Sequence, residues 1–427
     1  MSTYETFIFE SYAFDAEQKT LTLRYGIDDA YHFTETYTFD FDFAEYNPAT
    51  LDRAVQLLFF MAGVSYYKTF LPKNIVVQQG EIDPELAEFL AKTWQKGLGE
   101  FFYTNRLDPR TTIDFPTNTD TIQSTTHLGS GKLVGLGGGK DSLVSIELLR
   151  GEPNLATWSV GHRAQLTPLV ERSDLPHYWV SRVWDQQLLE LNGAGAYNGH
   201  VPISAILACA GVVAAVLSGR QDVVVSNEQS ANEPTLDYDG VAINHQYSKS
   251  QEFETDFQHI LAHQFGDSIR YYSLLRPLSE LRIAELFAKS GFEKYHDVFS
   301  SCNHAFTHDS DHMFWDETCP KCCFVYLALY PFVGAEKLGS VFRKNLLRES
   351  ALQPTYRQLL GIEGDKPLEC VGEIQECRAA MRMAQRDMDE LRDTYAFELP
   401  DSYDYTQLWS HNMPDDVWQT IASKLVS

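Results

Sequence analysis

The chain has 427 residues, of which 44% are hydrophobic and 13% aromatic, a length and composition typical of two or three domains with substantial cores. Its 59 acidic residues outnumber the 34 basic ones and give a formal net charge of −25. That charge would repel a nucleic-acid backbone unless the basic residues formed one patch, and the sequence shows no such patch. We therefore expect no nucleic-acid partner.

The N-terminus and the longest apolar stretch bear on the localisation of the protein. Residues 1–5 have neither the basic nor the apolar part of a signal peptide. The longest apolar stretch, residues 203–217, contains small residues and lies between Pro202 and Arg220, so we expect a buried helix and no membrane association. Seven cysteines without a spaced framework indicate thiols or a metal site. We expect a cytoplasmic protein.

The N-terminal region begins with strands and continues with helices. In residues 20–25 and 36–43 apolar and polar side chains alternate, which is typical of antiparallel strands with one solvent-exposed face. Residues 51–60 and 83–90 have helical spacing, with Asp83 as the N-cap of the second helix. The polar stretch 111–130 follows, and we place a domain boundary near residue 125.

The next segment predicts a phosphate site. Residues 132–136 form a short apolar run typical of a buried strand, and residues 142–150 have helical spacing. Glycines at the turn between them let backbone N–H groups approach an oxyanion, which the positive end of the helix also favours. The residues of this turn are Gly137, Gly138, Gly139, Lys140, Asp141 and Ser142.

Two familiar phosphate loops do not fit these residues. A Walker A loop needs glycine six residues before its lysine, where this chain has Val134, and Ser or Thr directly after the lysine, where it has Asp141. A dinucleotide-binding motif needs an acidic residue at the end of the next strand, where this chain has Gly161. The turn resembles the SGGxDS signature of the ATP pyrophosphatase (PP-loop) superfamily, with Gly137 in place of the first serine. The alternative is a structural glycine-rich turn.

Strands and helices alternate after the turn, which predicts a parallel sheet with covering helices. Expected strands are residues 156–160, 178–183 and 222–226. Ligands bind at the carboxyl ends of such strands, so polar residues there are site candidates, although surface loops are polar in any case. We expect Ser159 and Gly161 to bind the nucleotide. Candidates for binding the substrate follow the strands at 156–160 and 222–226, and those after the second of these strands could also bind Mg²⁺. The residues are His162 and Arg163 after the first strand, and Asn227, Glu228, Ser230, Asn232 and Glu233 after the second.

A cysteine cluster predicts a structural Zn²⁺. Residues 274–286 resemble a segment common in PP-loop enzymes, and residues 301–302 and 319–323 resemble the tail of the 7-cyano-7-deazaguanine synthase branch, where four thiolates bind zinc. The Cys-x2-Cys spacing suits tetrahedral Zn²⁺. Expected ligands are Cys302, Cys319, Cys322 and a fourth among Cys323, His304, His308 and His312. Alternatively, Cys322 and Cys323 are small core residues; Cys209 is expected in the core, and Cys370 and Cys377 carry no assignment.

Residues 340–427 have helical periodicity, with a basic face at 378–386 that is typical of a solvated helix. The expected fold class is α/β: a parallel-sheet PP-loop core (HUP-like, adenine nucleotide alpha hydrolase-like) at 126–338, an N-terminal β-rich α+β region at 1–125 and a helical C-terminal region at 339–427.

Nearly the whole chain resembles the PP-loop family of ATP-dependent UDP-N-acetylmuramoyl-L-alanyl-L-glutamate epimerases. Besides the glycine turn, the resemblance includes residues 63–68, 101–106 and 226–233. It implies a cytoplasmic enzyme of peptidoglycan precursor synthesis that uses ATP and Mg²⁺ and forms AMP and diphosphate. It also implies functional coupling to a ligase that adds L-Glu to UDP-N-acetylmuramoyl-L-alanine.

The chemistry of such an enzyme assigns roles to the candidates. A Cα proton beside a carboxylate is very weakly acidic, and adenylation replaces the carboxylate by a neutral carbonyl whose enolate positioned donors can stabilise. Lys140, Ser142 and the glycine amides would hold the diphosphate part of ATP, with Asp141 acting through Mg²⁺. His245 and Lys249 are the candidates for proton transfer at Cα.

Two other functions remain open at this stage. A PP-loop ligase or nucleobase-modifying enzyme would form the same adenylate and let a nucleophile intercept it; the cysteine tail favours this function, and the acidic charge opposes its tRNA version. A nucleotide-sensing module would bind ATP without chemistry.

Overall fold

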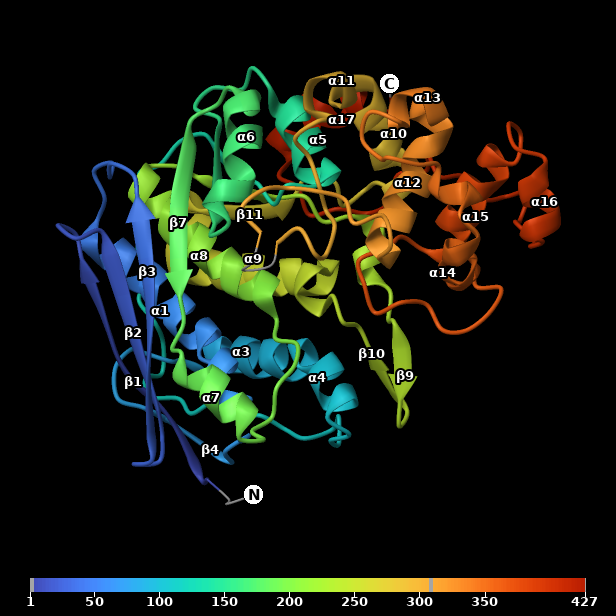
Figure 1. Ribbon diagram of the computed structural model, residues 1–427. Coiled ribbons are helices and arrows are strands. Elements are labelled where there is room, and N and C mark those ends of the chain that lie inside the picture. Colours follow the sequence, from blue (N-terminus) through green and yellow to red (C-terminus); the bar gives the residue numbers. More distant parts are fainter. Residues whose placement is uncertain (1–3, 307–309, 427) are drawn as a thin grey trace.

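A nine-stranded sheet organises the molecule in the computed structural model, which describes residues 4–306 and 310–426 (Figure 1). The strand order across the sheet is β11-β8-β5-β6-β7-β3-β2-β1-β4. The strands are β1 Thr6–Asp15, β2 Thr20–Ile27, β3 Tyr31–Asp40, β4 Asn74–Val77, β5 Lys132–Gly135, β6 Ala156–Val160, β7 His177–Val183, β8 Asp222–Val225 and β11 Arg270–Ser273. Strands β9 Leu236–Tyr238 and β10 Val241–Ile243 form a separate hairpin.

Strands β5 to β8 and β11 form the parallel half of the sheet, which confirms the expected α/β class. The chain starts this half at β5, adds β6 and β7 on one side, and then adds β8 and β11 on the other. The order therefore reverses between β5 and β8. In open α/β sheets such a reversal opens a crevice at the carboxyl ends of the strands, where ligands bind.

The N-terminal strands continue the same sheet. Strands β1, β2 and β3 pair in antiparallel fashion as predicted, and β3 pairs antiparallel with β7. One face of these strands is buried and carries Phe7, Leu21 and Tyr25, while the opposite face is more exposed. The sheet thus crosses the boundary expected near residue 125, and the proposed domain limits stay predictions.

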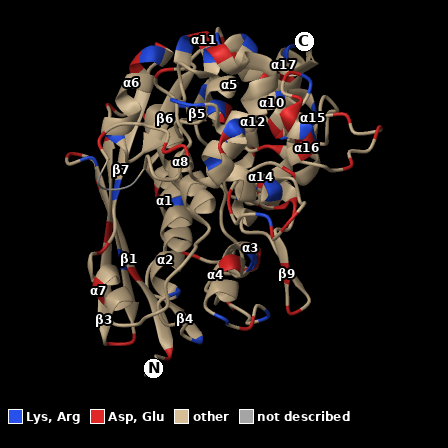
Figure 2. Cartoon of the chain, turned by 45° about the vertical axis from the view of Figure 1, so that its right-hand side comes forward, with Lys and Arg blue, Asp and Glu red and all other residues tan. Residues whose placement is uncertain are grey.

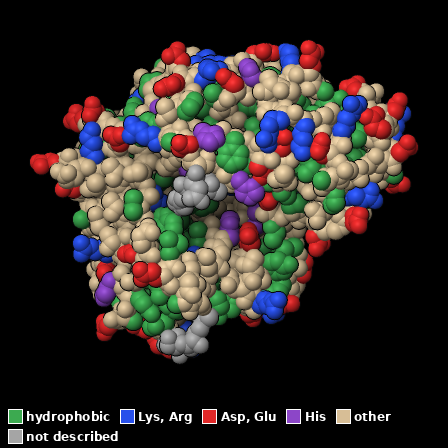
Figure 3. Space-filling view, viewed as in Figure 1, with side chains coloured by type: hydrophobic (Ala, Val, Ile, Leu, Met, Phe, Trp, Pro, Cys, Tyr) green, Lys and Arg blue, Asp and Glu red, His purple; other side chains and the backbone are tan. Residues whose placement is uncertain are grey.

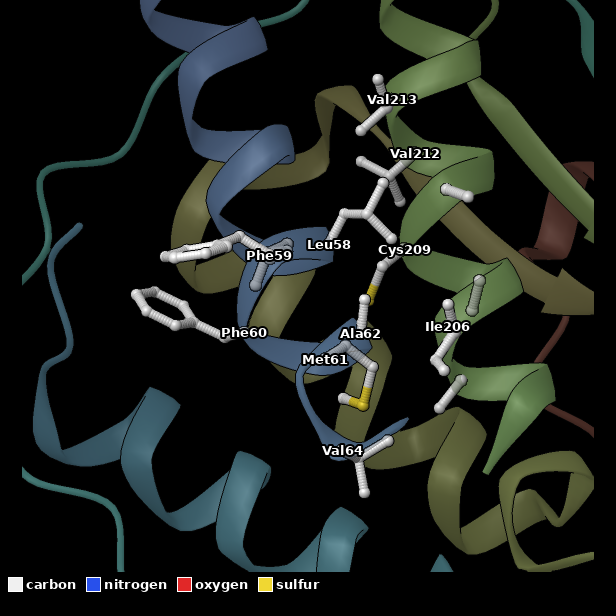
Figure 4. Close-up of a cluster of buried hydrophobic side chains, with 14 of the residues drawn as sticks. Leu58, Phe59, Phe60, Met61, Ala62, Val64, Ile206, Cys209, Val212 and Val213 are labelled. Carbon is white, nitrogen blue, oxygen red and sulfur yellow. The ribbon is translucent and has the colours of Figure 1, made fainter. Parts of the chain in front are cut away.

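Helices cover both faces of the parallel half. Neighbouring residues of one strand point to opposite faces. Leu133 therefore joins the cluster with α1 (Pro48–Ala62) and α8 (Ile203–Ser218), whereas Val134 joins the cluster with α5 (Lys140–Leu149), α10 (Glu280–Ser290) and α12 (Pro320–Val333). Figure 4 shows the first cluster, in which Leu58 and Met61 of α1 face Cys209 and Ile206 of α8. Cys209 is therefore a core residue, as expected.

The helix boundaries follow ordinary capping chemistry. Asn47, Asp83, Ser250 and Ser279 each accept a backbone N–H of the helix that they precede. The helices are α1 Pro48–Ala62, α2 Val64–Tyr67, α3 Pro84–Gly97, α4 Gly99–Thr104, α5 Lys140–Leu149, α6 Arg163–Ser173, α7 Gln187–Gly193, α8 Ile203–Ser218, α9 Gln251–Phe265, α10 Glu280–Ser290, α11 Phe292–Tyr295, α12 Pro320–Val333, α13 Ala335–Leu338, α14 Gln353–Leu359, α15 Ile374–Ala384, α16 Glu390–Thr394 and α17 Asp415–Val426.

Lys and Arg are distributed over many elements, with Asp and Glu among them (Figure 2). None of the helices within residues 4–306 and 310–426 has the length and apolar composition that a bilayer crossing requires.

Candidate active site

A cavity of about 610 Å³ opens where the order of the parallel strands reverses. The ends of β5, β6 and β8 supply Gly135, Ser159 and Val225 to its wall. The front face of the molecule is hollowed near its centre, with histidine side chains around the hollow (Figure 3). A cavity of this size is in the usual range for a small ligand or nucleotide.

The glycine turn forms one end of the cavity, which we call the loop end. Gly137, Gly139, Asp141 and Ser142 line it, and α5 begins at this turn. Gly138 has a φ of +93°, and a Cβ there would lie 2.7 Å from the Phe306 ring. The turn therefore requires glycine at this position, and it leaves the first amides of α5 at the cavity.

Lys140 lies behind the turn and is absent from the cavity wall. Its side chain is 2% exposed, and its ammonium is bound by the carboxylates of Asp141 and Glu280. Although burial opposes the charged form, these two carboxylates raise the pKa of Lys140. The lysine is a buried cation that joins the turn to α10, and Asp141 reaches the cavity beside it.

Of the residues expected after the parallel strands, Ser159 and Asn227 line the cavity. The Ser159 hydroxyl lies 3.0 Å from Nε2 of His177, which belongs to β7. The carbonyl of Asn227 accepts a hydrogen bond from Ser273 of β11, and this bond fixes the start of the loop after β8.

The other expected ligand residues lie elsewhere. Gly161 and Arg163 are outside the cavity wall, and Arg163 pairs with Asp40 at 2.5 Å across the sheet. Ser230 donates to the buried Glu228 carboxylate at 3.4 Å. Asn232 lines a second cavity, of about 790 Å³, next to the β9–β10 hairpin.

Two histidines and a glutamate form another part of the cavity wall, which we call the histidine end. His245 contacts the Thr235 hydroxyl through Nδ1 at 2.5 Å, and its Nε2 has no hydrogen-bond partner among the described residues. His200 Nδ1 lies 3.6 Å from the Glu100 carboxylate. Burial lowers the pKa of both His200 and His245 to about 4, and it raises the pKa of Glu100. Both imidazoles are therefore neutral at pH 7.

Lys249 supplies a cation at the histidine end. Its Nζ donates to Cys370 Sγ at 3.1 Å, and Cys370 also lines the cavity. The neighbouring Cys370, Glu228 and Asp141 raise the pKa of Lys249, so the amine is protonated at pH 7. The buried Arg276 holds the backbone of this region, because it donates to the carbonyls of Glu228 and Lys249.

Three of the predicted cysteines come together beside the loop end. Cys302 Sγ lies 4.0 Å from Cys319 Sγ, which lies 3.4 Å from Cys322 Sγ. The fourth group of this cluster is the Asp316 carboxylate, at 3.1 Å from Cys322 Sγ. Cys323 is buried outside the cluster, His304 binds the Asp316 carboxylate, His312 pairs with Asp311, and His308 lies outside the described residues.

Five residues that shape the site were not predicted from the sequence. Arg276 and Glu280 lie in the segment 274–286, whose resemblance to PP-loop enzymes was a usable signal. Glu100, His200 and Cys370 come from segments with no motif, and only the three-dimensional fold brings them to the cavity.

These features define an α/β protein whose ligand cavity lies at the reversal of a mostly parallel sheet, beside a glycine-rich strand-to-helix turn. The chain belongs to the MurL family: the MurL N-terminal domain matches residues 1–274, and the MurL C-terminal domain matches residues 298–404.

Three curated relatives carry the name UDP-N-acetyl-alpha-D-muramoyl-L-alanyl-L-glutamate epimerase. The protein of Xanthomonas oryzae pv. oryzae (strain MAFF 311018) is 40% identical over 385 residues, covering 88% of this chain and 85% of the relative. The protein of Salinispora tropica is 39% identical over 89% of this chain and 84% of the relative. The protein of Micromonospora sp. is 37% identical over 91% of this chain and 88% of the relative. No solved structure matches the chain.

Proposed function

We propose that the protein epimerises the terminal L-glutamate of UDP-N-acetylmuramoyl-L-alanyl-L-glutamate through an acyl adenylate, converting ATP to AMP and diphosphate. Membership of the MurL family supports the substrate and the overall reaction. The observation that carries the mechanism is that one cavity is lined by a phosphate-type turn, a neutral imidazole and a protonated amine.

The loop end suits the nucleotide. Backbone amides at Gly137 and Gly139 and the start of α5 favour the phosphates, and Ser142 offers a hydroxyl. The strand order of the parallel half and the position of the turn after β5 support a PP-loop core. The Asp141 carboxylate is a hard oxygen ligand at the cavity and would hold Mg²⁺, whose charge neutralises the phosphate oxygens when bound.

The histidine end suits proton transfer at Cα. A carboxylate oxygen of the substrate attacks the α-phosphorus and diphosphate leaves, so that the carbonyl becomes neutral and the Cα proton becomes more acidic. His245 lines the cavity and is neutral at pH 7, so we assign it as the base that accepts the Cα proton. Lys249 is protonated and returns a proton to Cα. Water then attacks the acyl carbon, the bond between that carbon and the phosphate oxygen breaks, and AMP leaves with one oxygen of the substrate carboxylate.

The cellular context is part of the same proposal. The enzyme acts in the cytoplasm, downstream of a ligase that supplies the L-glutamyl precursor to peptidoglycan synthesis. The ligand is a small molecule, and the 610 Å³ cavity holds the nucleotide and the reacting glutamate rather than the whole sugar nucleotide.

The test is a reaction in D₂O with ATP, Mg²⁺ and the UDP-linked L-Ala-L-Glu precursor. We expect deuterium at the glutamate Cα together with AMP and diphosphate, and no exchange when ATP is left out. AMP without exchange would instead indicate a ligase or hydrolase, and the absence of both products would indicate a nucleotide sensor.

A further inference from the structure

The cysteine cluster beside the loop end is a second potential ligand-binding site. Its four potential ligand atoms, from Cys302, Asp316, Cys319 and Cys322, all lie within 4.8 Å of one another. The three cysteines are at most 6% exposed. Three thiols and a carboxylate packed this closely offer four ligand atoms to one cation, which would compensate the charge that they carry when ionised.

We propose that Cys302, Asp316, Cys319 and Cys322 bind one Zn²⁺, and that this ion holds the wall of the cavity against the glycine turn. The first half of the proposal is independent of the reaction, whereas the effect on nucleotide binding rests on the proposed function.

The distances fit a single tetrahedral ion. Zn–S bonds of about 2.3 Å place two sulfurs about 3.8 Å apart, and the measured Sγ separations are 3.4 and 4.0 Å. In a [2Fe–2S] cluster at most two thiolates share an iron, and in a [4Fe–4S] cluster none do, so three thiolates on either cluster would not all lie as close together as they do here. The soft, thiolate-rich set also disfavours Mg²⁺ and Ca²⁺, which prefer oxygen ligands.

Asp316 is held as a ligand rather than as a surface carboxylate. Its Oδ1 accepts the backbone N–H groups of Thr318 at 2.8 Å and Cys319 at 3.0 Å, and its Oδ2 contacts His304 Nδ1. Such outer contacts orient metal-binding carboxylates in proteins. Cys323, one of the candidates for the fourth ligand, follows Cys322 on α12 and lies outside the cluster.

The cluster is joined directly to the glycine turn. Ser300 N–H donates to the carbonyl of Gly138 at 3.0 Å, and its hydroxyl accepts the N–H of Cys302 at 3.1 Å. Ser301 and Asn303, on either side of Cys302, line the cavity. Lys321, between Cys319 and Cys322, lines it as well and donates to the carbonyl of Cys370.

These contacts give the ion a specific structural task. It crosslinks the segment that supports Gly138 to the N-terminus of α12, and through Lys321 to the segment that carries Cys370. Loss of the ion would therefore loosen the loop end first, because Ser300 binds the carbonyl of Gly138 through its N–H and the N–H of Cys302 through its hydroxyl.

The test measures metal content by mass spectrometry in the full chain, purified without chelators and exposed to Zn²⁺. We expect about one Zn²⁺ per chain in the wild type. Cys302→Ala and Asp316→Ala should lose most of it, and the matched control Cys323→Ala should keep it. Equal loss in Cys323→Ala and Cys302→Ala would overturn the ligand set, and a metal-free wild type with a Cys319–Cys322 disulfide would overturn the site.

A spectroscopic measurement covers the case in which the cysteine variants do not fold. Wild-type chain exchanged with Co²⁺ should show thiolate-to-metal absorption and the strong visible bands of a tetrahedral ion, and a weak octahedral spectrum would contradict the proposal. ATP binding is then compared before and after chelation. Equal affinities would contradict the link to the glycine turn, whereas a zinc-loaded wild type that binds no ATP would contradict the proposed function and leave the metal site standing.

Discussion

The two ends of the cavity are built in different ways. The loop end consists of consecutive residues between β5 and α5, so one strand and one helix fix its shape. The histidine end is assembled from four well-separated segments, which carry Glu100, His200, His245 with Lys249, and Cys370. A binding site for a common group can thus lie in one short turn, whereas the groups that act on a particular substrate depend on the whole fold.

Removing the proposed base should have the largest effect on activity and should separate proton transfer from adenylation. In His245→Gln we expect Cα deuterium exchange to fall by about 10²- to 10⁴-fold, because no neutral imidazole remains to accept the proton. Diphosphate formation should continue, since the loop end is unchanged. Both products are measured in the same D₂O reaction.

The control for this variant is His259→Gln, because the His259 side chain is 71% exposed on α9. A parallel loss of exchange and diphosphate in His245→Gln would contradict the division of the cavity. The pKa of His245, lowered from 6.5 to about 4, adds a pH signature: wild-type exchange should persist below pH 6.5 and fall as the pH approaches 4.

Breaking the buried ion pair behind the turn should cost stability. Lys140→Met leaves the Glu280 carboxylate, which is 1% exposed, without its cation, and we expect a loss of about 3–5 kcal/mol in the free energy of unfolding. Lys140→Met with Glu280→Gln removes both charges and should recover part of that loss. Urea denaturation measures both; a double variant less stable than the sum of the single variants predicts would refute the pairing.

Changing the carboxylate at the loop end should affect both products equally. In Asp141→Asn we expect diphosphate formation and Cα exchange to fall together, by about 10²- to 10³-fold, because adenylation precedes proton removal. Exchange that survives without diphosphate would show that the two ends work independently. The same D₂O reaction, with AMP and diphosphate quantified, decides the question.

The smallest effect concerns a carboxyl behind the loop end. Burial raises the pKa of Glu376 from 4.5 to about 8, and Glu376 accepts the N–H of Glu280. A raised carboxyl pKa makes the folded state bind more protons, so this group lowers stability as the pH rises from 4.5 to about 8. Glu376→Gln mimics the protonated form and should flatten this part of the pH dependence. Unfolding at several pH values checks it, and an unchanged slope would contradict it.

Local patterns predicted much of the fold. Alternation located β2 and β3, the Asp83 cap located α3, and the glycine turn located β5 and α5. Strand β11 was missed because its four residues are largely buried and have no alternation. The joining of β3 to β7 was missed because such pairing depends on contacts far apart in the sequence.

Site residues that lie close together in the sequence were predicted. The turn gave Gly137, Gly139, Asp141 and Ser142 as cavity residues, and the Cys-x2-Cys spacing gave Cys319 and Cys322 as neighbours. Asp316 carries no sequence signal, because a lone aspartate is an ordinary surface residue until the fold places it beside three thiols.

The central claim is that the two ends act on one acyl adenylate, and oxygen labelling tests it most directly. The precursor carries ¹⁸O in the glutamate α-carboxyl and reacts with ATP and Mg²⁺ in D₂O. An acyl adenylate transfers one labelled oxygen to AMP, so we predict ¹⁸O in the AMP phosphate and deuterium at Cα from the same turnovers. Deuterium at Cα with unlabelled AMP would contradict the account.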